Sequence, residues 1–139
     1  WEETGRTVSY DLGTTDIAFS PNVVGSSIIS FTPVPQFKIA FISKYVGEQY
    51  FDNTSSADRQ LDAYFINNLQ LDYHLFPQKM QRISFQLLIN NLFDLKYENN
   101  AYGGASFFEN GANKPIEETW AYYYPQAGTN VMGKITLSF

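Results

Sequence analysis

The segment Val131-Met132-Gly133-Lys134-Ile135-Thr136-Leu137-Ser138-Phe139 ends the chain and directs the interpretation of everything before it. Apolar and polar side chains alternate along it, which is typical of a β-strand with one apolar and one polar face. Chain ends usually fray into solvent, so a strand that stops on an exposed phenylalanine is unusual in a soluble domain. In an outer-membrane β-barrel the last strand closes the barrel, and a terminal aromatic ring lies at the lipid interface. The segment therefore predicts an integral outer-membrane protein or a part of one.

The composition excludes several classes of protein. The 139 residues carry a formal net charge of −5, which argues against a nucleic-acid partner, because binding nucleic acid needs a basic patch. The chain has no cysteine, so it has neither a disulfide framework nor thiol chemistry. No run of 18 apolar residues occurs, which excludes a transmembrane helix from the sequence, whereas a barrel strand needs apolar residues on one face alone.

The same alternation recurs along the chain and predicts an all-β, antiparallel protein. Strands are expected at residues 28–32, 37–50, 64–75, 83–90 and 131–139, and a long aromatic loop is expected at 98–124. The charged residues within these strands all lie on the polar face: Lys38, Lys44, Asp72 and Lys134. A soluble sheet with one solvated face shows the same segregation, so the charges leave both architectures open.

The connections between the strands favour the membrane. They alternate short and long, at residues 33–36, 51–61, 76–81 and 98–124, as periplasmic turns and extracellular loops do in outer-membrane barrels. Aromatic residues also gather at the strand ends, as in the two interfacial girdles of such barrels. We therefore expect residues 22–139 to form the C-terminal part of a transmembrane β-barrel, and residues 1–21 to form an extracellular loop or a small hairpin from residues 8–12 and 17–19.

One motif resembles a known family. Asn91-Leu92-Phe93-Asp94-Leu95-Lys96-Tyr97 is similar to the stretch at the top of the penultimate strand in TonB-dependent outer-membrane receptors, in the style of Bacteroidetes. Three further pieces follow the family order: Lys44–Tyr50, Leu61–Tyr64 and Tyr124–Gly128, before the last strand to Phe139. The sequence departs from the pattern at Lys134, where many barrels have glycine five residues before the terminal aromatic.

The resemblance implies a fold, a function and partners. The last five or six strands of a 22-stranded barrel are expected here, with no enzymatic activity and no resident cofactor or metal. The parent protein would take up a scarce nutrient across the Gram-negative outer membrane: a ferric siderophore, haem, cobalamin or an oligosaccharide. Its partners would be outer-membrane lipid, the rest of the barrel and a plug domain, the TonB complex, the barrel-assembly machinery and the small-molecule nutrient. The alternatives are a small soluble all-β ligand-binding module and a small porin-like or adhesin-like barrel.

The candidate binding residues lie in the long loop, where aromatic rings could stack on a ligand: Tyr102, Phe107, Phe108, Trp120 and Tyr122. Structural roles are expected for the motif residues Asn91, Leu92, Phe93, Asp94 and Tyr97 and for Phe139. His74 is the single histidine and is expected to be structural, and Asp72 either pairs with a lysine across neighbouring strands or remains solvated.

Overall fold

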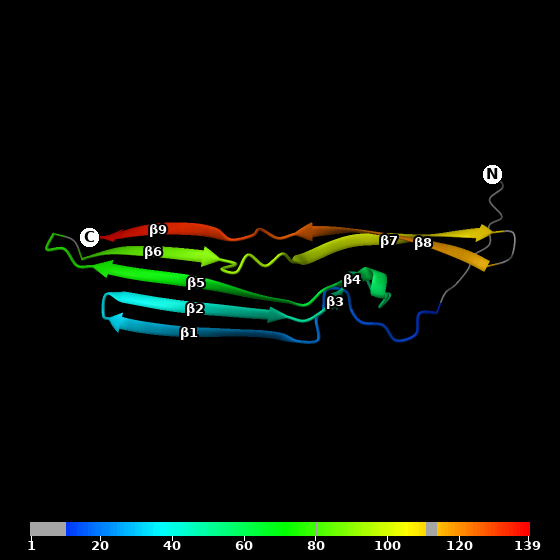
Figure 1. Ribbon diagram of the computed structural model, residues 1–139, viewed down its shortest axis with the longest axis horizontal. Helices are drawn as coiled ribbons and strands as arrows, with labels where there is room; N and C mark the ends of the chain where they lie inside the picture. Colours follow the sequence, from blue (N-terminus) through cyan, green and yellow to red (C-terminus); the bar gives the residue numbers. More distant parts are fainter. Residues whose placement is uncertain (1–10, 80, 111–113) are drawn as a thin grey trace.

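The computed structural model describes residues 11–79, 81–110 and 114–139, without the side chains of residues 107–110 and 114–117. It is an antiparallel all-β structure with one short 3-10 helix. Figure 1 shows an elongated molecule, with a sheet at one end and a long hairpin at the other. In the described part of the chain, no helix is long and apolar enough to span a bilayer.

Five strands form the main sheet in the order β1-β2-β5-β6-β9, and each pairs antiparallel with its neighbour. The sheet is open, since no pairing joins β1 to β9 among the described residues. The strand bounds are β1 Val24–Val34, β2 Phe37–Val46, β5 Tyr64–Leu75, β6 Arg82–Asn90 and β9 Asn130–Ser138. Phe139 follows the last strand and is highly exposed.

The register brings the apolar positions of all five strands to one face. Phe31, Ile39, Leu71, Leu87 and Gly133 form one row across the sheet. Further rows join the apolar residues above and below: Ile29, Phe41, Leu69, Ile89 and Val131; Phe37, Tyr73, Phe85 and Ile135. Because side chains alternate along a strand, matching registers confirm the common apolar face that the sequence predicts.

No second sheet of the described chain covers this face. Its side chains are 37% to 69% exposed at Leu87, Phe85, Leu75, Tyr73, Leu137, Phe65, Val131, Phe31, Ile135 and Ile29. The single side chain described as fully buried is Leu61, which lies outside the sheet beneath the hairpin. A packed core between two layers, as in a β-sandwich, is therefore not the architecture of the described residues.

The long loop expected at residues 98–124 is instead a β-hairpin. Strands β7, Glu98–Asn110, and β8, Lys114–Pro125, pair antiparallel with Tyr102 opposite Tyr122. The expectation of irregular structure was wrong because backbone pairing does not require apolar and polar residues to alternate. Figure 1 shows the hairpin continuing beyond β6 and β9, away from the short turns.

A small two-stranded sheet packs against the part of the hairpin that lies nearest the main sheet. Strands β3, Gln49–Tyr50, and β4, Gln60–Leu61, pair with each other and flank the 3-10 helix η1, Ala57–Arg59. Asp52 holds the connection by accepting hydrogen bonds from Thr54 and, at 2.7 Å, from the Arg59 guanidinium. Burial raises the pKa of Asp52, but these hydrogen bonds outweigh it and leave that pKa below its usual value.

The described part of the N-terminal segment, residues 11–21, contains no strand. Its backbone lies along the connection between β3 and β4, where Asp16 N–H donates to Ser55 Oγ and Ala18 N–H donates to Asn53 Oδ1. Phe19 N–H also donates to the Tyr50 carbonyl at 2.8 Å. Residues 17–19 therefore do not pair as a hairpin arm, and most of the other expected arm, residues 8–12, lies outside the described residues.

Candidate functional site

The hairpin has one packed face and one open face. On the packed face, Ala101 and Ala121 lie against Phe51 and Leu61, which form the small hydrophobic core. Phe51 also meets the ring of Tyr123 edge to face, with centroids 6.1 Å apart. These contacts hold the hairpin against β3 and β4, so its opposite face is turned to the outside.

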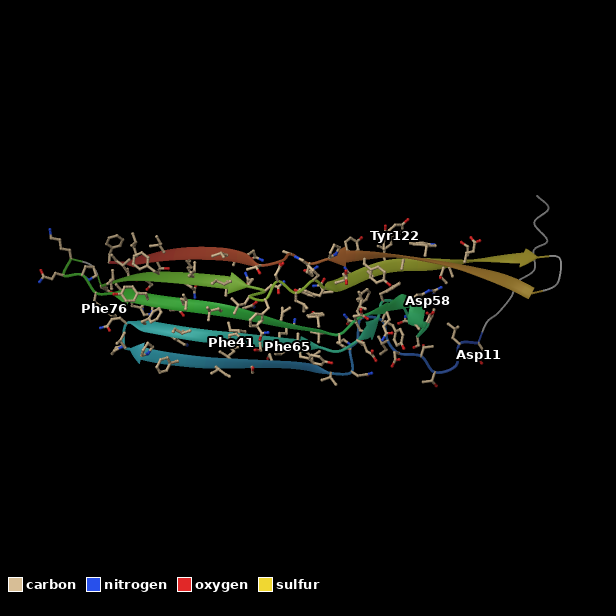
Figure 2. The ribbon with its side chains drawn as sticks, in the orientation of Figure 1. Asp11, Phe41, Asp58, Phe65, Phe76 and Tyr122 are labelled. Atoms are coloured by element: carbon tan, nitrogen blue, oxygen red, sulfur yellow. The ribbon has the colours of Figure 1, made fainter. Side chains whose placement is uncertain are left out.

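The open face carries four aromatic residues, here called the aromatic strip: Tyr102, Trp120, Tyr122 and Tyr124. Tyr102 and Tyr122 stack across the strands with centroids 5.3 Å apart and an interplanar angle of 22°. Tyr102 also lies 5.8 Å from both Trp120 and Tyr124. All four side chains are 45% to 60% exposed, and Figure 2 shows Tyr122 on the side of the hairpin away from Asp58.

Trp120 lies across the position of Gly104, its partner on the opposite strand. A Cβ atom placed on Gly104 would come within 2.9 Å of Cζ2 and 3.1 Å of Cε2 of the Trp120 indole. The indole therefore lies directly over the glycine position, while its side chain remains 45% exposed. Any larger residue at position 104 would push the ring away from the sheet, so the glycine is a steric requirement of this arrangement.

The resembling motif forms a tight connection between the sheet and the hairpin. This connection, here called the elbow, comprises residues 91–97 after β6 and residues 126–129 before β9. Asn91 is 4% exposed, and its side-chain amide donates to the carbonyls of Leu95 and Ala127 while its Oδ1 accepts from Leu95 N–H. The Asn91 carbonyl accepts from the Thr129 hydroxyl at 2.7 Å. The side chain and the carbonyl of Asn91 thus satisfy backbone and hydroxyl groups of both segments of the elbow.

Asp94 joins the two chain segments of the elbow a second time. Its carboxylate accepts from Lys96 Nζ at 2.9 and 3.0 Å and from Thr129 N–H at 3.0 Å. The hydrogen bond from Lys96 leads the causes that hold the pKa of Asp94 below its usual value. A Cβ on Gly128 would collide with Asp94 Oδ1, so this position needs glycine for the carboxylate to approach.

The structure gathers some of the predicted binding residues and leaves others unassigned. Tyr102, Trp120 and Tyr122 lie together in the aromatic strip. Tyr124 joins them, whereas the neighbouring Tyr123 packs against Phe51 on the other face. Phe107 and Phe108 belong to β7, but their side chains lie outside the described residues.

The other motif residues, which also belong to the elbow, have packing or backbone contacts. Leu92 N–H donates to the Asn67 carbonyl at 2.7 Å, whereas the Phe93 side chain is 69% exposed. The ring of Tyr97 packs on Tyr64 with centroids 4.5 Å apart, and the Tyr97 carbonyl accepts from Gln126 N–H. The motif as a whole is thus a structural joint between sheet and hairpin.

The polar face of the sheet has its own hydrogen bonds. Asp72 accepts from Gln70 Nε2 at 2.8 Å and from Gln86 Nε2 at 2.9 Å. The ion pairs seen among the described residues are Arg59–Asp52 and Lys96–Asp94, so of the two alternatives for Asp72 the pairing with a lysine is not seen there, and amide contacts occupy the carboxylate. His74 Nδ1 lies 3.0 Å from Ser84 Oγ on the neighbouring strand, and no cluster of three or more potential metal ligands occurs in the described part of the chain.

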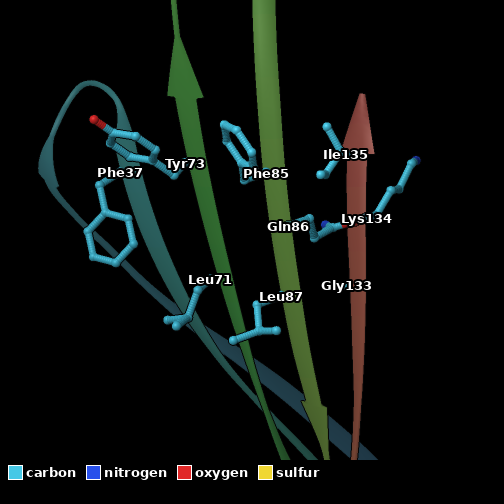
Figure 3. Close-up of a pocket in the computed structure, with 9 residues that line it drawn as sticks. All are labelled: Phe37, Leu71, Tyr73, Phe85, Gln86, Leu87, Gly133, Lys134 and Ile135. Atoms are coloured by element: carbon cyan, nitrogen blue, oxygen red, sulfur yellow. The ribbon is translucent and has the colours of Figure 1, made fainter. Parts of the chain in front are cut away.

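The apolar face has a shallow hollow at Gly133. Figure 3 shows Leu71, Leu87, Phe85 and Ile135 around the point where Gly133 contributes no side chain. A Cβ at Gly133 would meet nothing within 4 Å, so a side chain at this position would enter the hollow without a clash. The hollow is lined mostly by apolar groups and has no arrangement of groups suited to catalysis.

Comparison with known proteins found no match to this chain among the family models, the curated proteins or the solved structures.

Proposed function

We propose that this chain is a wall segment of an outer-membrane TonB-dependent receptor that takes up a scarce nutrient. The observation that carries the proposal is the exposed apolar face shared by five antiparallel strands. Soluble monomers rarely expose such a large continuous apolar surface, and the described chain contains nothing that covers it. Hydrocarbon is the environment in which this face is stable without a covering layer.

The dimensions of the face support a membrane span. The five strands are 9 to 12 residues long, close to the roughly 9–11 residues that a tilted transmembrane strand needs. Phe65 and Leu75 lie ten residues apart on the apolar side of β5, which corresponds to about 33 Å along the strand. A strand tilt of about 40° reduces this to about 25 Å, the usual height of the apolar band of an outer-membrane barrel.

One polar pair on the apolar face is compatible with lipid. Ser43 and Asn67 face each other across β2 and β5, and both are less than a tenth exposed. The Ser43 hydroxyl donates to Asn67 Oδ1 at 2.7 Å. Since a buried polar group is costly mainly when it lacks a partner, this shielded pair removes much of the penalty.

The two alternatives fit the described residues less well. A soluble all-β module would need a partner to cover the apolar face, and its small core beneath the hairpin involves few residues. A complete small barrel needs at least eight strands in one closed sheet, whereas the described sheet has five and is open. A segment of a larger barrel explains both the exposed face and the open sheet edges.

Topology in intact cells tests the proposal. On a cysteine-free background, a membrane-impermeant maleimide should label the Asp58→Cys variant, in the long connection, on intact cells. The matched Lys79→Cys variant, in the short turn after β5, should react only after the outer membrane is permeabilised. Equal labelling of both on intact cells, or recovery of the protein in the soluble fraction, would refute the proposal.

Nutrient uptake provides the second readout. Cells that carry the receptor should accumulate the nutrient, and the accumulation should stop when the TonB complex is deleted. Correct topology with uptake that does not depend on TonB would leave a passive porin-like barrel as the function.

A further inference from the structure

We propose that the aromatic strip binds a neutral oligosaccharide, with the outward face of Trp120 as its stacking platform. This inference rests on the proposed function, in which the hairpin projects from the cell surface. It selects one ligand class from those that such receptors import.

The geometry of Trp120 supplies the platform. The indole lies over Gly104, and the side chain is 45% exposed, which leaves ring surface accessible to a ligand. The ring of Tyr102 stands at 79° to the indole at a centroid distance of 5.8 Å and forms a wall beside it. A sugar ring has one face lined by C–H groups, and this face packs on the π-surface of an aromatic ring.

The same face of the hairpin carries the polar groups that sugar hydroxyls require. Tyr102, Tyr122 and Tyr124 have hydroxyls, which both donate and accept hydrogen bonds. Asn100 is opposite Tyr124, and Glu118 precedes Trp120 by two residues, so strand alternation places both on the open face. Both residues are exposed, and an amide together with a carboxylate offers donors and acceptors to neighbouring hydroxyls.

Charge selects against the anionic ligands. Glu118 is the charged residue of this face among those whose side chains are described, and the whole chain carries a net charge of −5. A ferric catecholate or the propionates of haem would meet like charge here, which lowers affinity. A neutral polyhydroxylated ligand incurs no such penalty.

The shape of the strip favours an extended ligand. Trp120 and Tyr124 are four residues apart on β8, which corresponds to about 13 Å and exceeds the width of one sugar ring. Tyr102 and Tyr122 stack at 5.3 Å and leave no space between them for a quaternary ammonium group, which requires ring faces on several sides. A chain of linked sugars matches an open, elongated aromatic surface.

Binding to an array of neutral linear and branched oligosaccharides tests the inference, with the whole receptor in detergent. The glycan that binds is then titrated calorimetrically against variants. Trp120→Ala removes the platform, and Gly104→Ala keeps every aromatic ring but displaces the indole. Both should weaken binding about tenfold, which corresponds to the loss of one aromatic stacking contact.

Two matched variants control for nonspecific effects. Phe93→Ala removes an aromatic ring that is 69% exposed outside the strip, and Gly25→Ala adds a methyl group where nothing lies within 4 Å. Both should bind as the unaltered receptor does. Binding that Gly104→Ala and Trp120→Ala leave unchanged overturns the inference. Failure of every array glycan to bind, or preference for haem or a ferric catecholate, also overturns it. Each of these results overturns the assignment of the ligand alone, and the proposed function still stands if the topology test succeeds.

Discussion

Asn91 has a left-handed backbone, with φ of 48°, and its buried side chain makes three hydrogen bonds to backbone groups of the elbow. Asparagine suits both demands, because it tolerates this conformation and its amide both donates and accepts. Asn90, one residue earlier, is more exposed and pairs with the side chain of Asn130 at 3.0 Å. Neighbouring asparagines therefore have different structural importance.

Replacing Asn91 by alanine should reduce the free energy of unfolding by about 2–4 kcal/mol, because buried backbone groups lose their hydrogen-bond partners and alanine tolerates a left-handed backbone less well than asparagine. Asn90→Ala should reduce it by less than about 1 kcal/mol. Urea titration of the proposed receptor in lipid vesicles measures both changes. Equal effects of the two substitutions would contradict the importance given to the elbow.

The carboxylate of Asp94 makes the elbow sensitive to acid. The hydrogen bond from Lys96, followed by that from Thr129 N–H, lowers its pKa below the ordinary value of 3.8. A lowered pKa stabilises the folded form fully above the unfolded value, and this contribution is lost as the pH falls through the folded value. The contacts of the Asp94 carboxylate should therefore stabilise the elbow at neutral pH, and this stabilisation should be lost only below about pH 4.

The Thr129 amide proton reports this change. Its NMR chemical shift should titrate with a midpoint below 3.8, since the amide donates to Asp94 Oδ1. In Asp94→Asn the titration should disappear while the rest of the spectrum is retained. A midpoint above 3.8 would show that the ion pair with Lys96 does not form in solution.

At the scale of the element, β6 separates the two faces of the sheet within two adjacent residues. Leu87 is opposite Leu71 and Gly133 on the apolar face, and Gln86 is opposite Asp72 and Lys134 on the polar face. Gln86 Nε2 donates to Asp72 Oδ1, so an arginine at this position could form an ion pair with the same carboxylate. Adjacent positions thus provide a matched pair for testing which face contacts lipid.

In the proposed receptor, Leu87→Arg should impair assembly, because a cation on a lipid-facing side near the middle of the bilayer costs about 2–4 kcal/mol. Gln86→Arg adds the same group one residue earlier and should assemble normally. Heat-modifiability on gels distinguishes folded from unfolded receptor in membrane fractions. Assembly of both variants to the same extent would argue that the apolar face does not meet lipid.

The strands differed in how well local pattern predicted them. Residues 64–75 were predicted as a strand with the bounds that β5 has, since apolar and polar residues alternate there without interruption. Strands β7 and β8 were missed because Tyr122-Tyr123-Tyr124 places aromatic rings on both faces. Asn110-Gly111, a dipeptide typical of hairpin turns, was the signal that would have indicated them.

At the scale of the whole molecule, the open edges and the exposed face have a direct consequence for the isolated chain. Among the described residues β1 pairs with β2 alone and β9 with β6 alone, which leaves a row of backbone groups at each side of the sheet. Such edges pair with other chains, and the apolar face adds a driving force for association.

Residues 1–139 on their own should therefore aggregate, self-associate or require detergent. Light scattering coupled to size-exclusion chromatography, with and without detergent, measures this. A sharp monomer peak without detergent, together with cooperative melting, would favour the soluble-module alternative.

The sequence by itself determined that the protein is all-β and antiparallel and which residues share each face of the sheet. Side chains alternate along an extended backbone, so the spacing of apolar residues in β2, β5, β6 and β9 is sufficient to predict strands and to say which residues share a side. It also indicated a structural role for Asn91, through the resemblance of the motif that contains it.

Only the tertiary structure decided the strand register, the hairpin and the aromatic strip. Trp120 covers Gly104 because the two are opposite each other across strands, although 16 positions separate them in sequence. Asn91 and Asp94 precede the hairpin in the sequence, and their side chains form hydrogen bonds with Ala127 and Thr129, which follow it. Such contacts depend on the cooperative pairing of distant segments, which local side-chain periodicity does not encode.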